Sequence, residues 1–330
     1  MQRLSDDRGA VSVVVALLMV PLLAIAAVAI DVAAMYADRQ QLQTGADAAA
    51  LSIAQMCARD TCTPADAEHL VELNKNDGDA TGTVLALDET TGQVTAQASS
   101  TREHWFAPVV GIDSTDIAAQ STARWGYPTG GPAVLPIAFS WCEVSQQAGI
   151  TPITNATGRT VGLDITGTTA ETVMLPTKSS QSECFGPSDL ALPGGFGWVP
   201  VTDQAECLAT TRNGDTLPSD PGKDFPCKTS SFSGEKLKSR LGTTVLLPIF
   251  DAVTGGGSTG AYTIVGYAAF ILTDYYFGSY DAPGTGACGT RTGNDHCLAG
   301  RFTTFVDLTT SFDFSPSGMQ IGAAAVRLTQ

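Results

Sequence analysis

Residues 10–30 read AVSVVVALLMVPLLAIAAVAI, a run of 21 residues without a charge near the start of a chain of 330. An α-helix rises about 1.5 Å per residue, so a run of this length just spans a hydrocarbon core of roughly 30 Å. A helix also satisfies its own backbone hydrogen bonds, as lipid requires, and tolerates Pro21 as membrane helices commonly do. The run predicts a single transmembrane helix, because no other apolar stretch approaches roughly 18 residues.

A cleaved secretory signal peptide is the alternative interpretation of the same segment. Arg3 and Arg8 could form its basic start, and small residues at 24–29 offer cleavage sites. An uncleaved anchor is favoured because the apolar core of a signal peptide is usually about 7–15 residues long, and because helical sequence continues past this run. Either interpretation carries the residues after 31 across the membrane.

The charges that flank the span predict its orientation. Arg3 and Arg8 precede it, and Arg39 is the first basic residue after it. Basic flanks stay on the cytoplasmic side, so we expect residues 1–9 in the cytoplasm and the bulk of the chain outside the cell membrane. The chain also carries 18 Lys and Arg against 33 Asp and Glu, a net charge of −15, which excludes nucleic acid as a partner because phosphates are repelled.

Residues 31–57 contain no proline and only one glycine, which predicts that the helix continues out of the bilayer as a stalk. Apolar residues repeat along it with steps of 7, 4, 3, 4 and 3, the spacing of a stripe on one helix face. Within the stripe, the candidate interface for a partner helix consists of Leu42, Ala46, Ala49 and Ile53. The alternative is that the stripe packs on the chain's own domain, and the sequence leaves both possibilities open.

The same region carries a family resemblance. The sequence DRGA at 7–10, the apolar span, Asp31 at its outer end and ADAAAL at 46–51 keep the order and spacing of one pattern. Over residues 6–55 the chain resembles the TadE/TadG-like Flp pilus-assembly family, and its TadG members most. The resemblance implies a membrane-anchored component of a pilus or secretion apparatus, a scaffold or minor pilus component whose partners are other helical membrane components, with a homo-oligomer also possible.

Two departures limit what the resemblance implies. Some relatives carry a von Willebrand A domain with a D-x-S-x-S metal motif, which DSTD at 113–116 does not fit, so no metal-dependent adhesion is expected. Flp-type prepilins are cut after a glycine that precedes a glutamate by five residues. Gly9 has Val14 at that position, so no such cleavage is expected.

The outer part is predicted to have two units. Residues 58–126 predict a small α+β unit, with a helix at 65–74, a hairpin at 83–88 and 93–99, an apolar stretch at 105–112 and a strand at 116–125. The sequence GYPTGGP at 126–132 predicts a linker. Residues 133–330 predict a β-rich domain, with strands at 134–139, 160–165, 172–175, 245–250, 262–272 and 302–308. The expected fold class is therefore α+β.

All eight cysteines lie beyond the span, at Cys57, Cys62, Cys142, Cys184, Cys207, Cys227, Cys288 and Cys297. Thiols in an oxidising compartment pair, so we interpret them as disulfides that staple the outer part. Eight cysteines allow 105 connectivities. Proximity in the sequence favours 57 with 62 and 288 with 297, which leaves 207 with 227 and 142 with 184.

No motif predicts catalysis, a cofactor or a metal site. A calcium-loop pattern begins at Asp77 and ends at Asp88, but a polar turn that enters a hairpin explains it equally well. The G-x-S-x-G match at 256–260 precedes a strand-like run instead of a helix, and the S-x-x-K match at 233–236 lacks its companion motifs. We therefore expect a binding protein and not an enzyme. The alternatives are a cell-envelope hydrolase and a secreted soluble binding protein.

Overall fold

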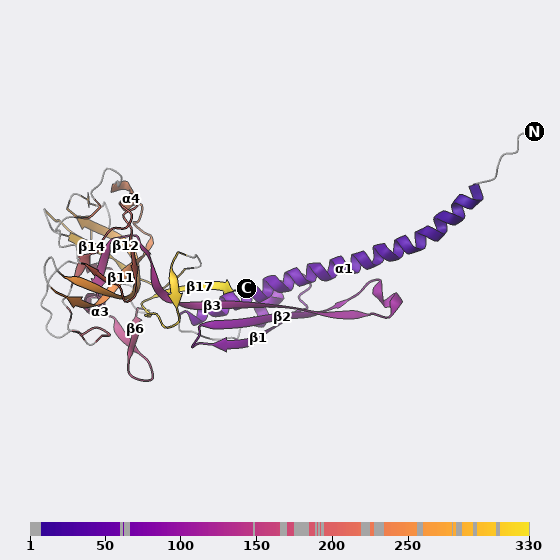
Figure 1. The fold of residues 1–330 in the computed structure, drawn as a ribbon, viewed down its shortest axis with the longest axis horizontal. Helices are drawn as coiled ribbons and strands as arrows, with labels where there is room; N and C mark the ends of the chain where they lie inside the picture. The colour runs from indigo at the N-terminus through magenta and orange to yellow at the C-terminus, as the bar shows by residue number, and fades with distance from the viewer. Residues whose placement is uncertain are drawn as a thin grey trace, which may run out of the picture.

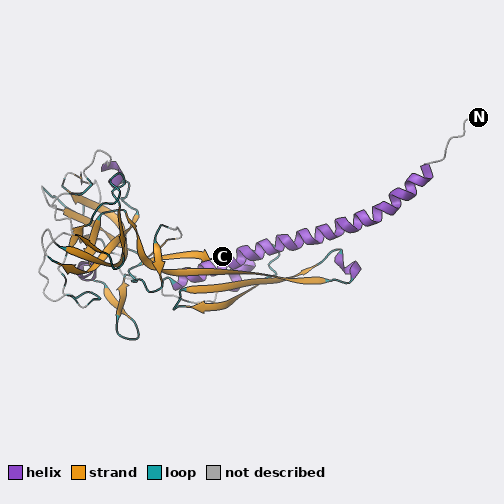
Figure 2. Cartoon of the chain, viewed as in Figure 1, coloured by secondary structure: helices purple, strands orange, loops and turns teal. Residues whose placement is uncertain are grey.

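A long stalk and a head at the end opposite the N-terminus make up the molecule (Figure 1). The computed structural model describes residues 8–59, 62, 67–147, 149–165, 170–174, 185–188, 190, 192, 195–218, 225–227, 234–255, 260–278, 280–281, 286–292, 296–307 and 311–329. Helices and strands are both present, with most strands in the head (Figure 2), so the α+β prediction is confirmed.

The stalk is a helix packed on a sheet. Helix α1 (Arg8–Cys57) is unbroken across Pro21, so the predicted span and the predicted stalk helix are one element. The sheet has the order β1–β2–β3–β17–β15, with bounds Thr81–Asp88, Gln93–Glu103, Ser114–Ala133, Ala323–Thr329 and Phe305–Asp307. The short helix α2 (Ala67–Leu73) packs against both α1 and β1.

Period-two patterning in the strands forms the stalk core. Val94, Ala96 and Ala98 alternate with more exposed neighbours along β2, as expected for a sheet with one covered face. Ala119 and Ala123 continue the buried row on β3. These small side chains form one core with the C-terminal half of α1, because alanine on both surfaces lets a helix and a sheet approach closely.

The head is built on an eight-stranded sheet. Its main path is β7 (Thr172–Met174), β14 (His296–Phe302), β12 (Ala261–Phe277), β11 (Thr244–Thr254), β4 (Ile137–Ser140) and β8 (Phe196–Trp198). Strands β10 (Thr216–Pro218) and β13 (Tyr280–Asp281) pair with β12, and β5 (Thr151–Thr154) and β6 (Thr160–Asp164) form a separate hairpin. Helices α3 (Trp141–Gln147) and α4 (Gly234–Lys238) complete the head, whose core is rich in aromatic residues.

The prediction of a linker at 126–132 is wrong. These residues form the later part of β3, which runs from the stalk into the head. There β3 pairs with β16 (Asp313–Ser315) and β9 (Ala209–Arg212). Its glycines serve close packing: a Cβ on Gly131 would lie 2.4 Å from the Phe312 ring, and one on Gly126 would lie 2.5 Å from the Ser315 carbonyl carbon. Glycine is typical of turns, but on this strand it is needed because the neighbouring atoms leave no room for a Cβ.

Three of the favoured disulfides are present, joining Cys57 to Cys62, Cys207 to Cys227 and Cys288 to Cys297. Cys142 is also disulfide-bonded. Its predicted partner, Cys184, lies outside the described residues. The first disulfide closes the C-terminal end of α1, and the other two staple the head.

Candidate functional site

Helix α1 changes its surroundings at Asp31. From Val11 to Ile30 its large apolar side chains are exposed on every face of the helix, with Leu17 at 71%. Within the described residues this is the one helix long and apolar enough to cross a membrane, and none of its most apolar part is buried in the protein. From Asp31 onward one face of the same helix is buried against the stalk sheet.

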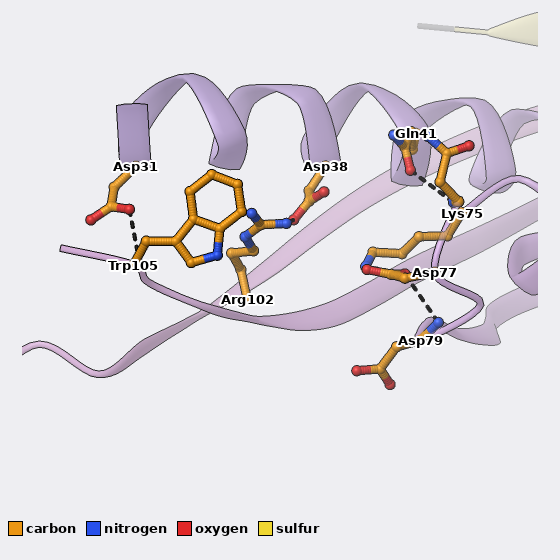
Figure 3. A network of polar contacts seen from close by, with 9 residues as sticks. Asp31, Asp38, Gln41, Lys75, Asp77, Asp79, Arg102 and Trp105 are labelled. Atoms are coloured by element: carbon orange, nitrogen blue, oxygen red, sulfur yellow. Dashed lines mark hydrogen bonds and ion pairs between the residues drawn. The ribbon is translucent and has the colours of Figure 1, made fainter. Parts of the chain in front are cut away.

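Asp31 receives the tip of the β2–β3 hairpin. Its carboxylate is buried and accepts backbone N–H groups from Trp105 at 3.0 Å, Phe106 at 3.0 Å and Ala107 at 2.8 Å. Ala107 begins the short 3₁₀ helix η1 (Ala107–Val110), whose first N–H groups have no acceptor within the helix itself. The carboxylate thus caps η1 and holds the hairpin tip on α1, and Figure 3 shows its contact with Trp105.

An ion pair attaches the same hairpin to α1 a second time, two turns further along the helix. Arg102 of β2 donates to the Asp38 carboxylate at 3.2 Å, and both side chains are largely buried. The Arg102 guanidinium also lies 5.2 Å from the centre of the Trp105 ring, a cation–π contact. Asp31 and Asp38 therefore bind the same hairpin from one helix face (Figure 3).

A third polar contact fixes the loop before β1. The buried Lys75 ammonium donates to both Asp77 carboxylate oxygens, at 2.7 and 2.8 Å, and the Asn76 N–H donates to Gln41 of α1. The hydrogen bond from Lys75 holds the pKa of the Asp77 carboxyl below its usual value. The calcium-loop interpretation is wrong, because Thr81 and Asp88, which would both be ligands, stand at opposite ends of β1, about 23 Å apart at 3.3 Å per residue.

The four candidate partner-helix residues lie in the chain's own core. Leu42 is 1% exposed and Ala46, Ala49 and Ile53 are 0% exposed, in the cluster that α1 forms with β2, β3 and α2. A partner helix cannot reach them while the stalk is folded. The stripe is thus explained by the alternative, packing on the chain's own domain, because the sheet supplies the apolar surface that a partner would otherwise supply.

Two titratable side chains of the head, Tyr267 and Asp251, have pKa values that are raised by burial. Burial raises the pKa of Tyr267 to about 12, and its hydroxyl donates to the Thr211 carbonyl at 2.6 Å. Burial also raises the pKa of Asp251. The described residues hold no group of three or more His, Cys, Asp or Glu that could bind a metal. Residues 256–259 and 228–233, with the serines of the two hydrolase-like matches, lie outside the described residues.

One residue and one segment of the candidate site were not predicted from spacing. Asp31 stood out as part of a family pattern, but its contact with residues more than 70 positions away could not be read from the sequence. The hairpin tip had one visible signal: residues 105–112, WFAPVVGI, are uncharged and lie between charged neighbours.

The apolar N-terminal helix suggests membrane anchoring, and the same helix continues as the spine of the stalk. Residues 9–55 match the family model described as "Putative Flp pilus-assembly TadE/G-like", which confirms the resemblance for that segment. The match and the apolar helix together fit a membrane-anchored pilus component. No curated protein and no solved structure matches the chain.

Proposed function

We propose that the chain is a scaffold or minor pilus component of a Flp/Tad-type pilus or secretion apparatus, and that it acts by binding and not by catalysis. In this proposal the N-terminus is cytoplasmic, residues 10–30 cross the membrane and the head is presented outside. The family match over residues 9–55 supports membership of such an apparatus, and the apolar helix supports anchoring.

The observation that carries the proposal is the continuity of α1. A helix that leaves a bilayer and then ends in a flexible loop would let its outer domain move freely. Here the same helix packs on the stalk sheet from Asp31 to Cys57, a length of about 40 Å at 1.5 Å per residue. The head is therefore held at a set distance from the membrane, as a scaffold requires.

The burial of the stripe moves the proposed partner contact into the bilayer. Other helical membrane components can reach the exposed faces of residues 11–30, where small residues such as Ala16 and Ala24 permit close approach. The stalk helix is already covered on its apolar face. The partner-binding surface that we propose is therefore the span.

Lysine labelling tests the orientation. All six lysines follow the span, and Lys236 and Lys238 lie exposed on the head. A membrane-impermeant amine reagent applied to spheroplasts should modify these two lysines, as read by mass spectrometry. Modification only after lysis would reverse the proposed orientation.

Co-purification tests membership and the partner surface together. The full chain, solubilised from cells that express the pilus apparatus, should co-purify with other helical pilus-assembly proteins. The matched variant replaces residues 10–30 by an unrelated apolar helix of equal length, which leaves the anchor and stalk in place. We expect that variant to stay in the membrane fraction and to lose the partners. Equal recovery from both proteins would refute the span as the binding surface, and recovery of no pilus-assembly protein by the natural chain would refute membership.

A further inference from the structure

The tip of the β2–β3 hairpin exposes a concentrated apolar surface. Residues 105–112 carry no charge, and four of their large side chains are exposed: Trp105 at 67%, Val109 at 90%, Phe106 and Ile112. The stalk core has no share of these side chains. Apolar side chains gathered in this way on a surface are typical of a site that binds another protein or a membrane.

The tip lies where the membrane begins. Trp105, Phe106 and Ala107 donate hydrogen bonds to Asp31, the residue that immediately follows the uncharged span. The hairpin runs along α1 and its tip points toward the N-terminal, apolar half of the helix (Figure 1). The chain's own hydrogen bonds therefore hold the apolar tip at the level of the bilayer surface.

The residue types suit the interfacial layer of a bilayer. Tryptophan and other aromatic side chains are enriched at the level of the lipid headgroups, where one part of the ring meets hydrocarbon and the other meets polar groups. Arg102 stacks on Trp105, but its largely buried side chain is paired with Asp38, so the aromatic ring and not this cation is the group presented to the membrane. Acidic Glu103 and Asp113 flank the stretch and limit how deeply it can enter.

We infer that the hairpin tip, residues 105–112, inserts into the interfacial layer of the membrane as a second, non-spanning contact beside α1. The occupant of this surface is lipid, because the span that the tip adjoins is itself surrounded by lipid. This inference rests on the proposed anchoring of residues 10–30. Two contacts on one leaflet would restrain the stalk from tilting about a single helix.

Trp105 reports its own surroundings, because the other three tryptophans, Trp125, Trp141 and Trp198, are buried in the protein. The full chain is placed in phosphatidylcholine vesicles whose lipids are brominated near the headgroup end or near the tail end of the acyl chains. The matched variant Trp105→Phe keeps an aromatic ring and removes only the reporter. The difference between the two proteins gives the emission of Trp105 alone.

We expect this emission to be blue-shifted and to be quenched more by the shallow bromines than by the deep ones. Emission that is quenched by aqueous iodide and not by brominated lipid would overturn the inference, since the tip would then face water. Protection from both quenchers would also overturn it, because a second copy of the chain would then cover the tip. Flotation with the vesicles separates the two proposals. A chain that floats with an unquenched Trp105 refutes only the tip contact, and a chain that does not float refutes the anchoring and the tip contact with it.

Discussion

The two halves of α1 are both rich in apolar residues, yet they meet opposite surroundings. Residues 11–30 are dominated by valine, leucine and isoleucine and expose them on all faces. Residues 31–57 bury one apolar stripe, made largely of alanine, in the protein, while Val32 and Tyr36 near its start stay exposed. The same continuous helix therefore exposes large apolar side chains in the half proposed to cross the membrane. In its other half it packs alanine side chains against the sheet.

The comparison shows that periodicity and side-chain size together indicate what a helix contacts. An apolar surface that is continuous around the helix suits a surrounding solvent such as lipid, which has no preferred direction. A narrow alanine stripe suits a second backbone that approaches from one side. The stripe did not reveal whether that backbone was a partner helix or the chain's own sheet.

Placing one charge in each half gives the largest expected effect. Ala46→Glu buries an unpaired carboxylate in the stalk core and should cost about 3–5 kcal/mol of the free energy of unfolding, without loss of membrane insertion. Ala24→Glu, near the middle of the span, should instead weaken insertion by about 2.5–3.5 kcal/mol and leave stalk stability unchanged. Denaturant unfolding and extraction from membranes at alkaline pH measure the two effects.

The control for this pair is Ala37→Glu, on an exposed face of the stalk helix. It should change neither quantity. Equal destabilisation of the stalk by Ala37→Glu and Ala46→Glu would contradict the burial of only one face of α1 over residues 31–57.

Removing the acceptor at the boundary between the halves gives a smaller effect. Asp31→Ala leaves the three N–H groups of Trp105, Phe106 and Ala107 without their shared acceptor, and should cost about 1–3 kcal/mol in the local stability of the hairpin tip. Amide hydrogen exchange at these residues should accelerate accordingly. Asp31→Asn keeps one carbonyl oxygen and should lose less. Unchanged exchange in Asp31→Ala would show that the tip does not depend on the helix.

Acid titration of the loop before β1, which contacts the C-terminal half of α1, gives the smallest effect. The pKa of Asp77 is lowered in the folded chain, chiefly by the hydrogen bond from Lys75. Its stabilising contribution is therefore present above the unfolded value, near 3.8, and is lost as the pH falls through the lower folded value. Asp77→Asn should flatten the loss of stability in this acidic range, whereas Asp79→Asn, at an exposed neighbour, should leave it unchanged. Parallel pH profiles for the natural chain and Asp77→Asn would argue against the Lys75 contact as a source of stability.

Local patterns predicted the elements well. The uncharged run predicted the span, and the alternation at 83–88 and 93–99 predicted the hairpin that β1 and β2 form. Cysteine proximity predicted the pairs that close short loops, such as Cys57 with Cys62. In each case the physical cause lies within a few residues of the pattern.

Contacts between distant segments were not predictable in the same way. GYPTGGP at 126–132 has the composition of a turn, and only the approach of Phe312 and Ser315 shows why a strand needs its glycines. The partner of the alanine stripe and the acceptor role of Asp31 likewise depend on strands that pair far along the chain. The burial of the stripe removed one candidate site, and the hydrogen bonds to Asp31 supplied another.

The last strand of the chain returns to the beginning of the fold. Strand β17 pairs with β3 in the stalk, and residue 329 lies opposite Thr122, so the head is an insertion between two neighbouring strands of the stalk. During synthesis α1 is therefore made first, while the sheet that packs on its C-terminal half stays incomplete until β17 has been made. Until then one edge of β3 lacks its partner strand and is open to pairing with another chain.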